Sequence, residues 1–360
     1  MPSPINIDFL STYTLMAINE EVVPPRNFFH DRYFPTEAGD VFASDKVLTE
    51  YRKGDRKMAA FVAQRAGDIP MDRRGYAIHE YQPAYIAPSR LLTIDELNKR
   101  GFGEALYANS TPAQRAARLL LDDMNDMELR ISRRLEWMCA QVMQNNACTM
   151  QTYIDATTQG EAEYVQFYDS SSDHTYAINT NYWTTWDNLK AGVRAMCRML
   201  TRRGLRAADL VLGSDVADSV LSIDDVQKLL DKNSGIRTGA IDETLTEYEG
   251  VTYIGRLNFG GNWLDVFSVD EEYTDDSDQT QKYFPATSAM VTAPGCGHMM
   301  YGQITQIEYG GTEFVTHAAA RVPKFSIDQD KDIRKLRLAT RPLAAPKTYC
   351  PYIYAANAVT

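Results

Sequence analysis

Cysteine and histidine are scarce in this sequence, which has five of each among 360 residues. The cysteine count is odd and no two cysteines have the CxxC spacing, so neither a disulfide framework nor a zinc ribbon is expected. No histidine belongs to an HExxH pair or a comparable set of ligands. We therefore expect free thiols in a reducing compartment and no metal site. The cysteines are Cys139, Cys148, Cys197, Cys296 and Cys350.

Positive charge and long apolar runs are also lacking. Lys and Arg number 37 against 48 Asp and Glu, which gives a formal net charge of −11. Such an acidic chain is poorly suited to wrapping nucleic acid as its main task, because phosphate binding needs a basic face. The sequence has no run of about 18 apolar residues that would indicate a membrane span. Its first residues lack the pattern of a secretory signal.

Common signatures of catalysis are missing as well. The sequence contains no GxGxxG motif, no phosphate loop ending in Gly-Lys-Ser or Gly-Lys-Thr, and no GxSxG elbow. Gly295 to His298 places a thiol two residues from an imidazole, but this glycine-rich segment is more typical of a turn than of a nucleophile pair. We expect no enzyme activity and no cofactor. The one enzymatic alternative uses Cys296 and His298.

The strongest local pattern predicts a long amphipathic helix over residues 112–145. Thr111 is a good N-cap, Pro112 suits the first helical position, and Gln114 completes a capping box. Apolar residues recur at steps of three and four, which is typical of a helix with one buried face. Such a helix would be about 50 Å long, and we expect a spine that lies across a sheet. The apolar positions are Ala113, Ala117, Leu120, Met124, Met127, Ile131, Leu135, Met138 and Val142.

Helix and strand patterns alternate in the second half of the chain, which predicts an α+β protein. A second amphipathic helix is expected from Trp186 to Arg203, with Gly204 as its C-cap. Two strand-like runs flank Gly260 and Gly261, which favours a hairpin. The other predicted elements are helices at 216–221 and 224–230, and strands at 209–212, 251–257, 263–269, 288–292, 299–304 and 313–319.

A basic island interrupts the acidic chain within residues 41–86, a segment whose pattern predicts a long two-stranded excursion. Seven basic and three acidic residues between Arg52 and Arg74 give the island a charge of +4. Such a hairpin is marginal without a partner surface. It is either a solvated loop or a hairpin that docks on an acidic surface of a neighbouring copy. The candidate contact residues are Arg52, Lys53, Arg56, Lys57, Arg65, Asp68, Arg73 and Arg74.

An acidic run follows the predicted hairpin of the second half. The stretch from Asp270 to Asp278 contains six acids, but it lacks the central Gly and the distant Glu of an EF-hand loop. We predict a solvated hairpin tip and not a calcium site. Its candidate surface residues are Asp270, Glu271, Glu272, Asp275 and Asp276.

Eleven short segments carry a further signal when they are taken together. They are Asn27–Pro35, Gly54–Val62, Arg74–Tyr76, Pro83–Ile86, Leu92–Leu97, Thr111–Arg115, Arg133–Met138, Tyr283–Pro285, Met290–Val291, Tyr301–Ile304 and Arg341–Pro346. Each is a weak pattern alone, but their order extends over essentially the whole chain. In combination the sequence resembles the lambda-type major capsid proteins of tailed bacteriophages, which have the Hong Kong-97 type capsid fold.

The resemblance implies a layout that agrees with the local patterns. The basic island would belong to an extended loop that reaches over an adjacent subunit, and the long helix would be the spine of a peripheral domain. The acidic run would lie on a hairpin of an axial domain, whose loops meet around five-fold and six-fold positions. The implied segments are an N-terminal arm (1–40), an extended β-hairpin loop (41–88), a peripheral domain (89–183) with its spine helix (112–145), an axial domain (184–320) and C-terminal return strands to the peripheral and axial domains (321–360).

The same resemblance implies a function in a shell. The protein would be a major capsid protein that self-assembles into hexamers and pentamers of an icosahedral head around double-stranded DNA. It would be a virion protein assembled in the host bacterial cytoplasm, without a membrane and with only non-specific DNA contact. Scaffolding, portal and decoration proteins would be separate partners. The alternatives are an encapsulin-type compartment of the same fold, a tail or connector protein, and the enzyme noted above.

Overall fold

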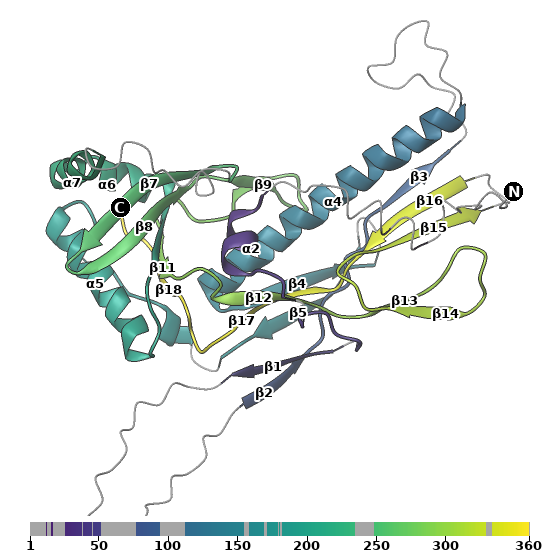
Figure 1. Ribbon diagram of the computed structural model, residues 1–360, viewed down its shortest axis with the longest axis horizontal. Helices are drawn as coiled ribbons and strands as arrows, with labels where there is room; N and C mark the ends of the chain where they lie inside the picture. The colour runs from purple at the N-terminus through teal and green to yellow at the C-terminus, as the bar shows by residue number, and fades with distance from the viewer. Residues whose placement is uncertain are drawn as a thin grey trace, which may run out of the picture.

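The computed structural model describes residues 12, 16, 26–37, 39–44, 46–51, 77–93, 112–154, 158–168, 171–178, 180, 182–234, 248–328 and 333–359. Within these ranges the molecule is elongated, and one long helix runs from a group of narrow sheets towards a wider sheet that carries further helices (Figure 1). The basic island and the predicted N-cap Thr111 lie outside the described residues.

The long helix α4 (Pro112–Asn145) has the bounds that the sequence predicts. Its apolar stripe is buried from Met124 to Val142, because residues three and four apart share one side of a helix. The opposite side carries the charge pairs Arg118–Asp122 and Asp126–Arg130. Asn146 ends the helix with a φ of 55°, in the left-handed region that Asn tolerates better than most residues.

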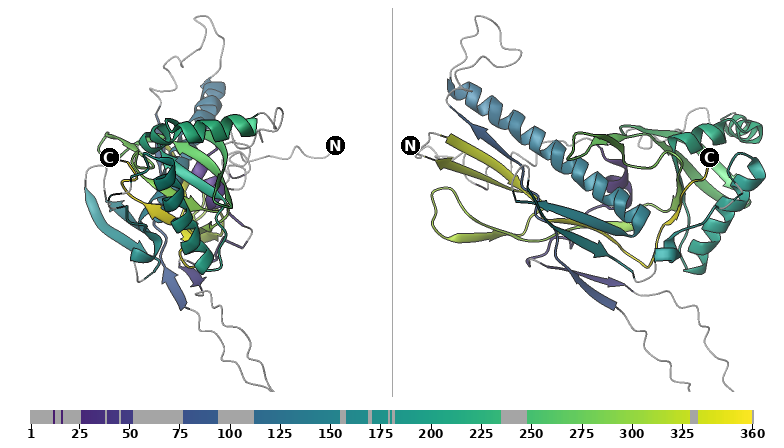
Figure 2. Two further views of the ribbon diagram at one scale, coloured as in Figure 1. Left: turned by 90° about the vertical axis from the view of Figure 1, so that its left-hand side faces the viewer. Right: turned by 180° about the vertical axis from the view of Figure 1, so that it is seen from behind.

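Three narrow antiparallel sheets lie along α4, which contacts strands of each of them. Figure 2 shows them from behind, on one side of the helix. This arrangement confirms the expectation of a helix laid across sheet structure. The strands are β3 (Ser89–Leu92), β15 (Val322–Asp328) and β16 (Ile333–Ala339) in the first sheet, β12 (Gly297–Tyr301) and β17 (Pro342–Pro346) in the second, and β4 (Ala147–Tyr153) and β5 (Gln159–Gln166) in the third.

The widest sheet has the strand order β18-β11-β6-β8-β7, in which β6 and β8 are parallel and the other neighbours antiparallel. The predicted helices and strands of this region are present. Their bounds are α5 (Trp186–Arg202), β6 (Asp209–Gly213), α6 (Ser214–Leu221), α7 (Asp224–Ser234), β7 (Val251–Phe259), β8 (Asn262–Val269), β11 (Ala289–Thr292) and β18 (Ile353–Ala355).

Two hydrophobic cores meet at this wide sheet. Leu210 and Leu212 of β6 point into a core shared with α5, whereas Val211 between them points into the core around α4. Successive strand residues face opposite sides of a sheet, so one strand serves both cores. Every residue of β6 is buried as a result.

Glycine sets two of the chain reversals that the sequence predicts. Gly204 has a φ of 82° after α5, and Leu205 donates its backbone N–H to the Leu200 carbonyl at 3.0 Å, which is the pattern of a Schellman cap. Gly260 and Gly261 have φ values of 64° and 101° in the two-residue turn between β7 and β8. Positive φ at both positions suits a tight hairpin turn.

One predicted strand is broken in two. The segment 299–304 contains the end of β12 and the start of β13 (Ile304–Ile307), which pairs with β14 (Phe314–His317). Gly302 still donates its N–H to the Arg341 carbonyl, next in register after Tyr301 and Pro342, whereas Gln303 donates to the Ser44 carbonyl. The sequence pattern did not predict this change of partner, because it depends on segments far away in the chain.

The helix α2 (Phe28–Tyr33) fills the space between α4 and the wide sheet. Phe28, Phe29, Tyr33 and Phe34 are all fully buried. The Phe28 ring lies 5.2 Å from the ring of Phe267 in β8. The predicted N-terminal arm 1–40 therefore contains a segment that packs inside the chain's own core.

Candidate assembly surfaces

The hairpin of β1 (Val47–Tyr51) and β2 (Ala77–Tyr81) brings together the two ends of the basic island. Tyr51 lies directly opposite Ala77 in the antiparallel register. The described residues on either side of the island segment therefore lie next to each other. All eight candidate contact residues of the island lie in this stretch, outside the described residues.

The base of this hairpin is tied to the body of the molecule. The Tyr81 hydroxyl donates to the Gln166 carbonyl at 3.0 Å, and its ring lies 5.3 Å from that of Phe167. On the other side, Phe42 donates its backbone N–H to the Tyr301 carbonyl at 2.8 Å. These contacts fix the position of the two strands that flank the basic island in the sequence.

The acidic run forms a hairpin of β9 (Glu272–Thr274) and β10 (Thr280–Lys282), as predicted. Asp275 closes its turn, because one carboxylate oxygen accepts the backbone N–H groups of Ser277 and Gln279 at 2.8 and 2.9 Å. Among the described residues, no group of three His, Cys, Asp or Glu side chains is arranged to hold a metal ion. The hairpin tip is exposed and polar.

This acidic hairpin packs against α4. Arg134 of α4 forms an ion pair with Asp276 at 2.6 Å, and the Trp137 indole donates to the Tyr273 hydroxyl at 3.0 Å. Of the five predicted surface residues, Glu271 is the most enclosed, and burial raises its pKa to about 7. Asp270 is paired with Lys282 at 2.6 Å. The structure thus brings the acids together on one hairpin, with part of their charge already neutralised.

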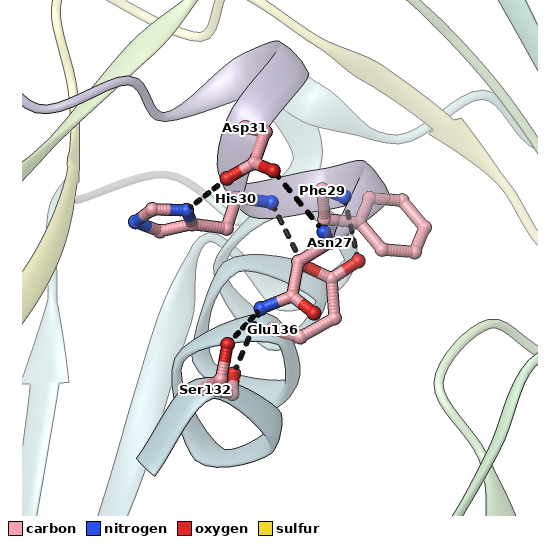
Figure 3. A network of polar contacts seen from close by, with 6 residues as sticks. All are labelled: Asn27, Phe29, His30, Asp31, Ser132 and Glu136. Carbon is pink, nitrogen blue, oxygen red and sulfur yellow. Dashed lines mark hydrogen bonds and ion pairs between the residues drawn. The ribbon is translucent and has the colours of Figure 1, made fainter. Parts of the chain in front are cut away.

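A buried carboxylate fastens α2 to α4 (Figure 3). Glu136 is fully buried and accepts the backbone N–H groups of Phe29 at 2.6 Å and His30 at 2.8 Å. The Asn27 amide reaches the Ser132 hydroxyl one helical turn away, at 2.6 Å. Burial raises the pKa of Glu136 to about 8, although the two backbone bonds favour its charged form.

The sequence alone assigned no role to this contact. Two of the eleven segments that carry the family resemblance, Asn27–Pro35 and Arg133–Met138, supply most of the residues involved. Glu136 lies outside the predicted apolar stripe, and its burial depends on the distant segment that packs on it, so the local pattern carried no signal for this contact.

An ion pair joins α2 to the wide sheet. The Arg32 guanidinium donates two hydrogen bonds to the Asp209 carboxylate, at 2.6 and 3.0 Å, and stacks 4.6 Å from the centre of the Phe267 ring. The Tyr33 hydroxyl donates to the same carboxylate at 3.1 Å. Asp209 is fully buried at the start of β6. α2 is therefore held at one side by an ion pair with Asp209 and at the other by hydrogen bonds to Glu136.

The turn with Cys296 and His298 separates the two side chains. The Cys296 thiol lies 3.9 Å from the Tyr33 carbonyl, whereas the His298 imidazole pairs with Asp40 at 3.0 Å. Burial raises the pKa of Cys296 to about 12, so that it stays a thiol at neutral pH. A nucleophilic cysteine needs the opposite shift, so this geometry does not favour the enzymatic alternative.

Large apolar side chains are exposed at the ends of several hairpins. Ile154 after β4 is 73% exposed and Phe314 in β14 is 76% exposed. Trp263, next to the β7–β8 turn, is 48% exposed. Such residues at projecting ends are suited to contacts with another protein surface.

No helix among the described residues has the length and apolar character to span a membrane.

Comparisons with known proteins found relatives among phage proteins. The family model described as phage major capsid protein E matches residues 11–353. A solved structure from an Escherichia coli CFT073 prophage, to which a capsid role has been ascribed, has a TM-score of 0.64 at 15% identity and covers 96% of this chain and 99% of its own. A phage-related protein of Bordetella bronchiseptica RB50 has a TM-score of 0.52 at 11% identity, with 97% and 98% covered. No curated protein sequence gave a match.

Proposed function

Since the chain belongs to the family of phage major capsid protein E, we propose that its segments have different roles in the assembled shell. The protein is a phage major capsid protein with the Hong Kong-97 type α+β fold, and it is a structural component of an icosahedral capsid. The observation that carries the proposal is the anchored hairpin of β1 and β2, whose two strands flank the basic island in the sequence. The segments have different parts in the shell.

The described residues would form the part of each subunit that builds the wall of the shell. In this proposal α4 and the narrow sheets form the peripheral domain, whose strands come from the predicted segment 89–183, from the return segment 321–360 and, with β12, from the segment predicted as axial. The return segment also supplies β18 to the wide sheet, in line with its predicted return to both domains. The wide sheet with α5, α6 and α7 forms the axial domain, predicted at 184–320. Support comes from the two hydrophobic cores, since α5 and α6 pack in one of them and α4 packs in the other, with the wide sheet between the two. α2 would couple the two domains within a subunit.

The basic island would bind an acidic surface of an adjacent subunit. It carries +4, and the remaining residues have 30 Lys and Arg against 45 Asp and Glu, or −15. Opposite charges on separate parts of one chain favour contacts between copies and set their register. The anchored base described above supports this role, because it gives the island a defined starting point.

Charge reversal tests the role of the island. Arg73→Glu with Arg74→Glu should lower the yield of closed particles at least tenfold, while far-UV circular dichroism of the unassembled subunit stays unchanged. The matched control is Arg73→Lys with Arg74→Lys, which keeps the charge and should assemble. Both are measured by sedimentation and negative-stain electron microscopy. Normal shells from the Glu variant would contradict the proposal.

The finer parts of the assembly also remain proposals. We expect hexamers and pentamers that form in the host bacterial cytoplasm around separate scaffolding and portal proteins, with a decoration protein added to the shell. Contact with the packaged DNA would be non-specific, since a net charge of −11 repels phosphate more than it binds it. Double-stranded DNA inside purified particles would support this, and enzyme cargo inside them would favour the encapsulin-type alternative.

A further inference from the structure

One face of the sheet β15-β16-β3 carries an unusual set of cations. Lys324 of β15 lies directly opposite Arg337 of β16, and Lys335 lies two residues before Arg337. Residues that are directly opposite, or two apart on one strand, share a face of the sheet. We call Lys324, Lys335 and Arg337 the basic sheet face.

The basic sheet face points away from α4. The neighbouring residues Phe325 and Leu336 occupy the other face and are buried in the core around α4. Arg90 of β3 shares that other face, and its guanidinium binds Asp126 of α4. Alternation along the strands therefore directs the three cations to the outer side.

Among the residues that the structure describes, these cations have no ion-pair partner. Two like charges directly opposite each other destabilise a sheet, and burial together with the charge of Arg337 lowers the pKa of Lys324. Within the described ranges, no carboxylate forms an ion pair with Lys324, Lys335 or Arg337. The Nε of Arg337 is buried and has no hydrogen-bond partner, although the same side chain donates to the Gln306 amide oxygen at 3.0 Å. Such a surface is completed by an external anion.

Apolar groups among the cations favour a protein as the source of that anion. Leu91 lies directly opposite Lys335 and is 53% exposed. Tyr85 is 45% exposed and lies between two guanidinium groups, 6.0 Å from that of Arg337 and 5.7 Å from that of Arg341. A DNA backbone would cover the charges but would leave the leucine against water or phosphate. An acidic protein segment can cover both.

The acidic hairpin β9–β10 supplies the matching charge, but only from another copy. Its Glu272 and Asp278 are exposed, and the hairpin packs on α4 through the pairs Asp276–Arg134 and Tyr273–Trp137. The basic sheet face points away from α4, so the hairpin of the same subunit does not cover it. We propose that the basic sheet face binds the acidic hairpin β9–β10 of a second copy. A contact of this kind joins two different surfaces and so builds rings or shells, not closed pairs.

The test reverses charge on one side and then on both sides. In the full chain, Lys324→Glu with Lys335→Glu should reduce capsomers and shells at least tenfold in sedimentation at matched concentration. The thermal midpoint of the unassembled subunit should stay the same or rise, because a glutamate at 324 would face Arg337. Adding Glu272→Lys with Asp278→Lys to the same chain should restore assembly. In every copy the sheet face then carries the acids and the hairpin the added lysines, so the two surfaces are complementary again.

The controls separate this contact from a general effect of net charge. Arg198→Glu with Arg202→Glu changes the net charge equally at exposed positions of α5 and should assemble. Equal loss in this control, or no rescue by the four-residue exchange, would overturn the proposal. Normal shells that lack only DNA would assign the face to phosphate instead. If the unaltered chain formed no shells with its neighbouring genes, the proposed function would fail and not this contact alone.

Discussion

Replacing Glu136 with glutamine tests whether a buried carboxyl group controls the stability of the subunit. The Glu136 carboxylate accepts two backbone N–H groups of α2, at 2.6 and 2.8 Å, from within a fully buried site. Burial raises its pKa from an ordinary 4.5 to about 8. The substitution keeps the shape of the side chain and removes its ability to titrate.

The expected effect follows from the direction of this pKa change. A carboxyl group whose pKa is higher in the folded state binds a proton more readily when folded, so its stabilising effect is complete below pH 4.5 and is lost as the pH rises to about 8. Each pH unit in this window corresponds to about 1.4 kcal/mol. Glu136 should therefore lower the free energy of unfolding by up to about 5 kcal/mol between the two ends of the window.

The assay is urea unfolding of the unassembled subunit between pH 5 and pH 8, followed by tryptophan fluorescence. At pH 5 the Glu136→Gln variant should be less stable than the unaltered protein by about 1–3 kcal/mol, because its amide nitrogen cannot accept the second backbone N–H. The gap should close and then reverse as the pH rises. Glu271, whose pKa is also raised by burial, remains in both proteins and contributes to both curves.

An exposed carboxylate provides the control. Glu161→Gln on β5 should give a curve parallel to that of the unaltered protein. The reasoning is refuted if the curve of Glu136→Gln is parallel as well, since the buried carboxyl group would then not change its proton binding on folding.

Two further substitutions test the joints around α2 and β6. Asp209→Ala should lower the free energy of unfolding by about 3–5 kcal/mol, because it leaves the Arg32 guanidinium enclosed without its counter-ion; a loss below about 1 kcal/mol in urea unfolding would show that this pair is unimportant. Gly213→Ala should cost about 1–3 kcal/mol and lower the calorimetric midpoint, because a Cβ there would lie 2.3 Å from the Pro285 carbonyl oxygen and 2.4 Å from that of Ala286. An unchanged midpoint would mean that this backbone can yield.

Elements whose signals are local could be predicted from the sequence. The steps of three and four predicted α4 and the helix-start residues from Thr111 to Gln114 predicted its beginning, while Gly204 and the pair Gly260–Gly261 marked reversals that need positive φ. The acidic run was also predicted as a hairpin tip, and the structure shows that Asp275 closes this turn through its own neighbours. These patterns depend on neighbours within a few residues.

Contacts between distant segments could not be derived in this way. Arg32 and Asp209 are 177 positions apart, and Phe29 and Glu136 are 107 apart. The local sequence pattern of one segment does not indicate which distant segment it contacts. The basic sheet face was missed for the same reason, because Lys324 and Arg337 become neighbours only when the register of β15 and β16 is known.

The resemblance to a known family supplied what the local patterns lacked. It named the capsid fold and the shell function, and the match over residues 11–353 confirms both. It did not place residues at contacts between subunits. The roles of the basic island and of the acidic hairpin between copies stay predictions, because they concern surfaces that meet only in the assembled shell.

The position of α2 in the chain has a consequence for the order of events during synthesis. α2 leaves the ribosome early, yet its partners Glu136, Asp209 and Phe284 lie about 100 to 250 positions later. At about 5–20 residues per second, the last of them appears roughly 13–50 s after α2. Until then four large aromatic side chains have no pocket. The later segments of the chain therefore determine when folding of the subunit can finish. A nascent chain cannot become competent for assembly before the wide sheet exists to receive α2.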